Sequence, residues 1–359
     1  MPAAETTPPD AADFARRLPK VLLHEHLDGT LRVATLWELM RARGIDSPAG
    51  DVAGLAAWFE ARAHAGSLVE YLKGFALTVA AMASPAALQR VAFEAAEDAL
   101  AQGCVLAEFR IAPLLLEPHG VAPDAAVEAM LAGLARSALP SGLIVCAMRQ
   151  LPEDETLRAA ELALRWQGRG VIGFDLAGPE RGFPPALHAR ALARVRDAGL
   201  PITLHAGEAD DAGRVLEAGR LGARRIGHGV HLVDALHDPA RTGLLQEAKA
   251  LGLHLEVCPT SNVHTGAAAS LATHPITALW RAGISLSFHT DNTLMSCISL
   301  SGEAEALLNG TALTAGELLQ MQLHAAAASF LPGPARAAAC DRILAFARQA
   351  GLNPGAAAA

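Results

Sequence analysis

Short apolar runs recur along the chain, and each is bounded by glycine, proline or polar residues. Runs of roughly four to eight apolar residues between such breaks are typical of strands buried on both faces. Stretches with helical periodicity separate most of the runs and predict helices over 152–167, 185–198 and 244–250. The predicted strands are 21–27, 105–112, 143–149, 171–176, 202–206, 225–229, 253–258 and 284–290.

This alternation predicts parallel strands joined by crossover helices. Periodicity alone also allows a doubly wound sheet, but polar residues that a core would avoid end many of the runs, as at His24, Glu108, Asp175 and His228. Chemically active groups at the carboxyl ends of several strands are typical of a barrel. We therefore predict an α/β fold, a (β/α)8 barrel of the TIM type.

The long interval between the first two predicted strands indicates an insertion. Residues 33–102 have a helical pattern there, with helices expected at 35–43 and 86–101. No linker separates two autonomous units. We expect one barrel domain over 13–350 that contains the insertion, with flexible tails at 1–12 and 351–359.

Composition narrows the possible partners. A net charge of −8 over 359 residues, with 4% aromatic residues, argues against nucleic acid or an anionic membrane as a partner. No apolar run approaches the ~18 residues that span a bilayer, and the first ten residues do not resemble a secretory signal. Five scattered cysteines without a CxxC pair suit a reducing cytoplasm. The oligomeric state is not fixed by the sequence.

Histidines and one aspartate at strand ends suggest a metal site. His24 and His26 are two residues apart, so a continuing strand would point both, and Asp28 with them, to one face. His205 ends the fifth predicted strand and Asp291 follows the eighth. Three imidazoles and a carboxylate form a nitrogen and oxygen ligand set that suits zinc.

Acid–base groups stand beside these candidate ligands. Glu208 follows His205 by three residues, and His228 lies between Gly227 and Gly229, whose small size leaves room for a ligand. A metal that lowers the pKa of bound water, next to spare proton donors, suits hydrolytic attack on an electrophilic carbon.

Taken together, these motifs resemble the adenosine deaminase family of metal-dependent amidohydrolases, in its bacterial branch. The resemblance spans residues 18–308, and the combination of motifs is specific where no single one would be. The matching segments are Leu18-Pro19-Lys20-Val21 with His24, His26 and Asp28, then Asp175-Leu176-Ala177-Gly178, His205-Ala206-Gly207-Glu208, Arg225-Ile226-Gly227-His228-Gly229, Cys258-Pro259-Thr260-Ser261-Asn262 and Thr290-Asp291.

The resemblance implies zinc-dependent deamination of adenosine or 2′-deoxyadenosine at purine C6, by zinc-bound hydroxide, to give inosine and ammonia. The implied zinc ligands, one ion per chain, are His24, His26, His205 and Asp291.

The resemblance also implies a role for each remaining site residue. His228 would orient and deprotonate the zinc-bound water, and Glu208 would protonate purine N1. The Gly178 backbone would meet purine N3, and Asp28 would hold a ribose hydroxyl. Many family members have a second aspartate where this chain has Asn292. An amide NH₂ can still donate to purine N7, so we expect purine recognition to be retained.

Four other histidines carry weaker expectations. His289 shares a strand face with Asp291, and we expect a hydrogen-bonded interior role rather than a catalytic one. His264 has no assigned role. His231 and His237 are expected at the surface.

Several alternatives stay open at this point. Adenine deaminases share the metal site, but usually have glutamate at the position of Asp28, so the shorter side chain favours a nucleoside. A modified adenine nucleoside is also possible, as is an inactive nucleoside-binding barrel. A binuclear site is disfavoured because 171–178 contains no lysine, and a cytidine-deaminase site because Cys258 has no partner cysteine nearby.

Overall fold

The structure, a computed structural model, describes residues 10–64 and 68–352, with the side chains of 65–73 and 239 excepted. The predicted tails therefore lie mostly outside the described residues. The first helix, α1, covers Ala11–Arg17, so it begins inside the predicted amino-terminal tail. The Asp10 side chain explains this start, because it accepts a hydrogen bond from the Ala12 backbone N–H and caps the helix.

Parallel strands form the centre of the described chain, and all the predicted strands are present. They pair in sequence order within two groups, β1 to β4 and β5 to β8. Single parallel bridges, Phe174 to Ile202 and Glu25 to Asp291, connect the two groups. The strands are β1 (Lys20–Leu22), β2 (Cys104–Ile111), β3 (Ser141–Met148), β4 (Val171–Ala177), β5 (Thr203–Ala206), β6 (Arg225–His228), β7 (His254–Val257) and β8 (Ser285–Phe288).

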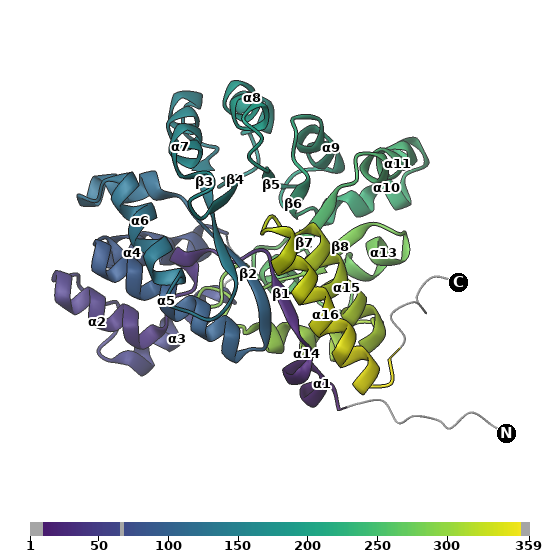
Figure 1. Cartoon of the computed structure of the whole chain (residues 1–359), viewed down its shortest axis with the longest axis horizontal. Helices are drawn as coiled ribbons and strands as arrows, with labels where there is room; N and C mark the ends of the chain where they lie inside the picture. Colours follow the sequence, from purple (N-terminus) through teal and green to yellow (C-terminus); the bar gives the residue numbers. More distant parts are fainter. Residues whose placement is uncertain (1–9, 65–67, 353–359) are drawn as a thin grey trace.

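Helices surround these strands, as Figure 1 shows. The arrangement is a TIM-type barrel, so the predicted fold is confirmed. The remaining α-helices are α2 (Val33–Arg43), α3 (Val52–Ala63), α4 (Leu68–Met82), α5 (Pro85–Ala101), α6 (Pro123–Leu134), α7 (Glu153–Trp166), α8 (Ala189–Asp197), α9 (Ala212–Arg220), α10 (Asp234–His237), α11 (Thr242–Ala250), α12 (Pro259–His264), α13 (Ile276–Arg281), α14 (Leu300–Gly310), α15 (Ala315–Ala328) and α16 (Gly333–Gln349). Short 3-10 turns are η1 (Leu27–Gly29), η2 (Pro113–His119), η3 (Pro185–His188), η4 (Val230–Val233) and η5 (Pro239–Arg241).

Helices α2 to α5 lie between β1 and β2, where the insertion was expected. The sequence before α5 favours a helix start. The Ser84 side chain caps the helix by accepting a hydrogen bond from the Ala87 N–H, and Pro85 occupies the first turn, where its missing N–H is harmless. Helix α15 begins with a capping box formed by Thr314 and Glu317.

The strand register brings the polar strand ends to one side of the barrel. His205 on β5 lies opposite Gly227 on β6, and the bridge from His26 to Arg110 aligns β1 with β2. Because all strands are parallel, their carboxyl ends meet at the same rim.

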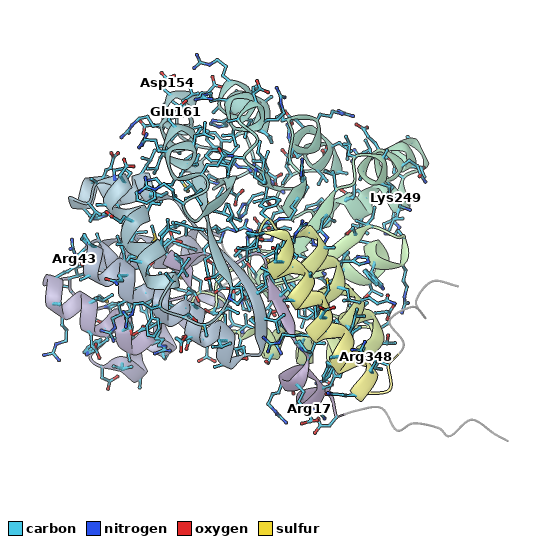
Figure 2. The ribbon with its side chains drawn as sticks, in the orientation of Figure 1. Arg17, Arg43, Asp154, Glu161, Lys249 and Arg348 are labelled. Carbon is cyan, nitrogen blue, oxygen red and sulfur yellow. The ribbon has the colours of Figure 1, made fainter. Side chains whose placement is uncertain are left out.

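Charged side chains lie mostly at the outside. Figure 2 shows labelled examples, such as Asp154, Glu161 and Lys249, on helices that face away from the barrel. In the part of the chain that the structure describes, no single helix is long and apolar enough to cross a membrane. Only the bent pair Gly74–Met82 and Pro85–Ala101 meets that test, by length and composition together.

Candidate active site

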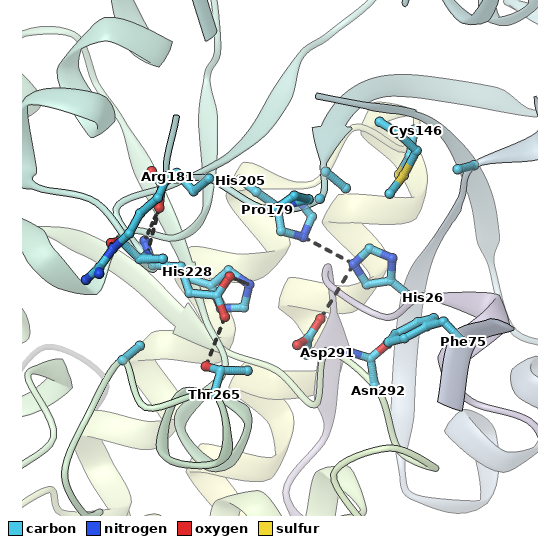
Figure 3. Close-up of a pocket in the computed structure, with 18 of the residues that line it drawn as sticks. His26, Phe75, Cys146, Pro179, Arg181, His205, His228, Thr265, Asp291 and Asn292 are labelled. Carbon is cyan, nitrogen blue, oxygen red and sulfur yellow. Dashed lines mark hydrogen bonds and ion pairs between the residues drawn. The ribbon is translucent and has the colours of Figure 1, made fainter. Parts of the chain in front are cut away.

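Four predicted ligands meet at the carboxyl-end rim. Ligand atoms of His24, His26, His205 and Asp291 all lie within 4.8 Å of one another. The Nε2 atoms of His26 and His205 are 3.2 Å apart, and Asp291 Oδ1 lies 3.2 Å from His24 Nε2 and 3.5 Å from His26 Nε2 (Figure 3). Ligand atoms around a tetrahedral zinc ion at about 2 Å lie about 3.3 Å from one another, which is close to these separations. The cluster therefore fits a metal ion.

Buried carboxylates below the cluster fix the orientation of two imidazoles. His24 Nδ1 lies 2.9 Å from Glu256 Oε2, and His205 Nδ1 lies 3.0 Å from Asp175 Oδ2. An ionised carboxylate only accepts hydrogen bonds, so both Nδ1 atoms donate and both Nε2 atoms keep a lone pair for the metal.

Arginines hold these carboxylates in the ionised form. Arg110 donates to Asp175 (2.8 Å) and to Glu256 (2.6 Å), and all three side chains are fully buried. Burial alone would raise the carboxyl pKa values. The charge of Arg110 and the hydrogen bond from His205 hold the pKa of Asp175 well below its usual range, and the charges of Arg110 and Arg225 do the same for Glu256. The metal ligands thus rest on a layer of paired charges.

Backbone strain marks two of the predicted site residues. His228 has φ of 65° and Asp291 has φ of 64°, in the left-handed region that non-glycine residues rarely adopt. Such conformations persist only where the surroundings enforce them, and they cluster at functional sites. Gly227 lets two imidazoles approach its backbone, because a Cβ atom there would lie 2.9 Å from His24 and 3.2 Å from His205.

Glu208 and His228 form the predicted acid–base pair next to the metal ligands. Glu208 Oε2 lies 3.6 Å from His228 Nε2, and Oε1 accepts a hydrogen bond of 3.1 Å from the Thr265 hydroxyl (Figure 3). The Glu208 side chain is 22% exposed and that of His228 only 2%. The carboxyl group therefore faces the pocket while the imidazole is covered.

A chain of hydrogen bonds fixes the tautomer of His228. The Ile276 N–H donates to His274 Nδ1 (3.1 Å), so neutral His274 carries its proton on Nε2. That nitrogen lies 3.3 Å from Asn262 Oδ1, which leaves Asn262 Nδ2 to donate to His228 Nδ1 (3.0 Å). Burial lowers the pKa of His274 to about 4, so this imidazole is neutral near pH 7. Neutral His228 therefore carries its proton on Nε2, toward Glu208.

One pocket of about 500 Å³ joins these groups, a volume typical of small-molecule sites. Its walls contain every predicted site residue except His24, which lies below it. The lining also contains apolar side chains from several strand ends and helices. The lining residues are His26, Asp28, Phe75, Ala112, Leu115, Cys146, Met148, Ala177, Gly178, Pro179, Glu180, Arg181, His205, Glu208, Ala209, His228, His231, Thr265, Gly266, Ala267, Asp291 and Asn292.

Asp28 reaches the pocket by a route that the sequence did not predict. The strand ends at Leu22, and single bridges at Glu25 and His26 are followed by the 3-10 turn η1. Strand alternation therefore does not place Asp28, and that expectation was wrong. Its Oδ1 atom is buried without a hydrogen-bond partner, and burial, with Asp291 adding to it, raises its pKa to about 7.

Gly178 and Asn292 line the same pocket, and a glycine makes each position possible. Gly178 has φ of +99°, and a Cβ atom there would collide with the Gln150 side chain. A Cβ atom on Gly29 would overlap the Asn292 side chain, so this glycine lets the amide lie against η1. In Figure 3 Phe75 of α4 lies beside Asn292.

The family model described as adenosine deaminase matches residues 19–346. This chain belongs to the adenosine deaminase family. An adenosine deaminase from Mycobacterium avium (strain 104) is 39% identical over 358 residues, which cover 94% of this chain and 97% of that protein. The identity of the family predicted from the sequence motifs is thus confirmed.

Solved structures extend the likeness in fold. An adenine deaminase from Arthrobacter aurescens superposes with a TM-score of 0.83 at 24% identity, over 92% of this chain and 99% of that one. The N6-methyl-AMP deaminase from Arabidopsis thaliana gives 0.81 at 25% identity, over 94% and 99%. The barrel of adenosine deaminase relatives is therefore shared among proteins named for different purine substrates.

In this member of the adenosine deaminase family, some of the weaker predictions for histidines are confirmed and one is wrong in part. His289 is buried and hydrogen-bonded to Ser287 and to the Leu23 N–H, as expected of an interior residue. His264 packs its ring against His64 at 4.9 Å between centroids. His237 is exposed, but His231 is only partly exposed and lines the pocket, so its expected surface position was wrong in part.

Sequence reasoning missed several residues that support the site. Glu256 was hidden inside an apolar run, where a single charge in a buried strand was the available signal. Asn262 belonged to a matching motif without an assigned role, and Thr265 and His274 gave no signal. Glu180 follows Gly178 by two residues and was likewise passed over.

Proposed function

We propose that this chain hydrolyses adenosine, and 2′-deoxyadenosine, to inosine and ammonia with one zinc ion per chain. The observation that supports this proposal is the set of side chains that line one pocket. Three members of the His₃Asp cluster, His26, His205 and Asp291, line it together with Glu208, His228 and Asp28, a buried carboxyl group that has an unpartnered oxygen.

The residues that would hold the metal are His24, His26, His205 and Asp291. An all-nitrogen and oxygen set with three imidazoles favours zinc. When bound, the ion would lower the pKa of a coordinated water and so supply a nucleophile at neutral pH.

Glu208 is proposed to give a proton to purine N1. Protonation there makes C6 electrophilic, so that the oxygen of water can add to it. One proton of that water goes to the amino group, which leaves as ammonia, and the other returns to the Glu208 carboxylate. Thr265 holds one carboxyl oxygen of Glu208 and leaves the group facing the pocket. The net reaction consumes one water for each ammonia released.

His228 is proposed to orient the attacking oxygen by donating from Nε2. The hydrogen bonds from Ile276 through His274 and Asn262 favour this donor role over the base role that the family resemblance implies. A fixed N–H aimed at an oxygen that gains negative charge stabilises the transition state more than the ground state.

Purine and ribose recognition would come from the remaining pocket residues. The Asn292 amide can donate to N7, and the backbone of Gly178 can approach the ring because that residue lacks a Cβ atom. Asp28 offers its unpartnered oxygen to a ribose hydroxyl. A free base would leave this buried carboxyl group unpaired, which favours a nucleoside.

The test is release of the C6 amine by the zinc-loaded protein, measured as ammonia from adenosine and adenine and as methylamine from N6-methyl-AMP, with metal content measured in parallel. A preference for adenosine supports the proposal. A preference for adenine or N6-methyl-AMP would keep the metal site but overturn the substrate. No release from any of them, with zinc bound, would point to an inactive barrel.

Asp28→Ala sharpens this test. It should raise KM for adenosine by about 10- to 100-fold and leave any slow turnover of adenine unchanged, because only the nucleoside uses the carboxyl group. Asp154→Ala, at an exposed carboxylate on α7, is the matched control. Equal effects on both substrates would remove Asp28 from ribose recognition.

A further inference from the structure

Glu180 makes an unusual set of contacts in the loop after β4. Its Oε1 atom accepts from the Gly207 N–H (2.6 Å), and its Oε2 atom accepts from the N–H groups of Glu208 (3.0 Å), Ala209 (2.7 Å) and Asp210 (3.0 Å). The residue is 5% exposed. One buried carboxylate thus satisfies four successive backbone amides of the loop after β5.

The geometry of that loop requires an anion. Gly207 has φ of +64°, and this bend helps to turn the following N–H groups toward one point. Successive amides that converge in this way form an anion-binding nest. Without Glu180, one buried and three partly buried donors would lose their acceptor, so the loop could not keep this shape at the same free energy.

A buried arginine lies near Glu180 and the loop that it holds. Arg149 lies at the end of β3, and its Nη2 atom donates to the carbonyl of Leu176 (2.9 Å) and to that of His205. Burial lowers the pKa of Arg149, and the charge of Glu180 is the largest influence that raises it. The arginine also ties the ends of β4 and β5 together, next to the loop.

The loop held by Glu180 is the one that carries Glu208. The Glu208 carboxyl group itself has weak support, a single hydrogen bond from Thr265 and His228 at 3.6 Å. Its position relative to the metal ligands therefore depends on its backbone. Both Glu180 oxygens accept hydrogen bonds from amides of the loop, so the carboxylate acts on the backbone that carries Glu208.

We propose that Glu180 is a positioning residue, which holds the 207–210 loop so that Glu208 points at the reacting purine. This inference rests on the proposed function, in which Glu208 is the proton donor. Displacement of a reacting group by about 1 Å can lower the rate by about 100-fold, so we expect a change in kcat rather than in KM.

The first experiment measures kcat and KM of zinc-loaded Glu180→Ala with and without added formate. We expect kcat for adenosine to fall by about 100-fold with little change in KM, and formate to restore part of it by occupying the vacated nest. Glu153→Ala is the matched control, because Glu153 also accepts from a backbone N–H, that of Arg190 (2.8 Å), but on α7 away from the pocket. Formate should not affect it.

Amide hydrogen exchange tests the same inference without any turnover. Exchange at residues 207–210 should accelerate by on the order of tenfold or more in Glu180→Ala, and formate should reverse it. Glu180→Gln keeps one acceptor oxygen and the shape of the side chain, so its exchange rate at 207–210 should lie between those of the parent and Glu180→Ala. This variant keeps the inference testable if the alanine variant does not fold.

Three outcomes would overturn the inference. The first is unchanged amide exchange at residues 207–210 in Glu180→Ala. The second is an unchanged kcat in a Glu180→Ala protein with full metal content. The third is a loss of kcat that formate does not restore although formate slows amide exchange in the loop again. If the wild-type protein fails to deaminate adenosine but the exchange result holds, the proposed substrate fails and the positioning of the loop stands.

Discussion

The floor and the rim of the pocket are built differently. The floor consists of His24, Asp175 and Glu256, which are fully buried on or next to the strands and locked by paired charges. At the rim, Glu208 is 22% exposed and sits on a loop that side chains of other loops hold in place. Buried carboxylates on strands, Asp175 and Glu256, orient two of the imidazoles that would bind metal, whereas contacts between loops hold Glu208, which would give a proton.

This difference predicts that damage to the floor affects metal binding and stability, and damage to the rim affects turnover. The comparison fails if a rim substitution empties the metal site, or if a floor substitution leaves metal affinity unchanged. Four substitutions test it.

Glu208→Gln should have the largest effect on activity. The amide cannot give a proton to N1, so kcat should fall by about 10²- to 10⁴-fold while zinc content stays at one per chain. Steady-state kinetics and metal analysis on the same preparation check this. Unchanged turnover would remove Glu208 from the mechanism.

Asn262→Asp should reverse the tautomer of His228. A carboxylate only accepts, so it would draw the His228 proton to Nδ1 and leave Nε2 without one. We expect kcat to fall by about 10- to 100-fold if His228 donates, and nitrogen-15 chemical shifts of the ring should report the change. A rate that is maintained or increased would instead favour the base role of His228.

Glu256→Gln tests the floor. Loss of the carboxylate behind His24 should weaken zinc binding by about 10- to 100-fold, measured by competition with a chelator. Glu108→Gln is the control, because Glu108 is equally buried and pairs with Arg225 at 2.7 Å, but contacts no metal ligand. A loss of zinc affinity as large in the control would show that stability alone, not orientation of His24, sets the affinity.

Glu303→Gln has the smallest expected effect, and this effect is on the free energy of unfolding. Glu303 holds the segment after β7, which lies next to the rim of the pocket. Glu303 on α14 accepts from the Thr260 N–H at 3.0 Å, while its Oε2 atom is buried without a partner. Burial raises its pKa from 4.5 to about 7. The folded state therefore favours the neutral acid, and the stability it contributes below pH 4.5 is lost as the pH rises through 7.

The neutral glutamine removes this loss. The free energy of unfolding of Glu303→Gln should exceed that of the parent by about 1–3 kcal/mol at pH 8 and match it near pH 4.5. Urea unfolding at the two pH values decides this. A variant destabilised equally at both would mean that the hydrogen bond to Thr260, rather than the charge, dominates.

The sequence by itself determined the barrel and the metal cluster. Apolar runs with polar ends are a local pattern, and parallel strands necessarily bring those ends to one rim. His24, His26, His205 and Asp291 could therefore be named before any contact was known.

Only the tertiary structure decided what supports the site. Glu256 acts on His24 across 232 positions, and Glu180 holds the amides of a loop that follows a different strand. Asp28 reaches the pocket through a 3-10 turn instead of the strand alternation expected of it. Such pairings depend on which buried donors and acceptors meet once the barrel has closed, and no spacing along the chain encodes them.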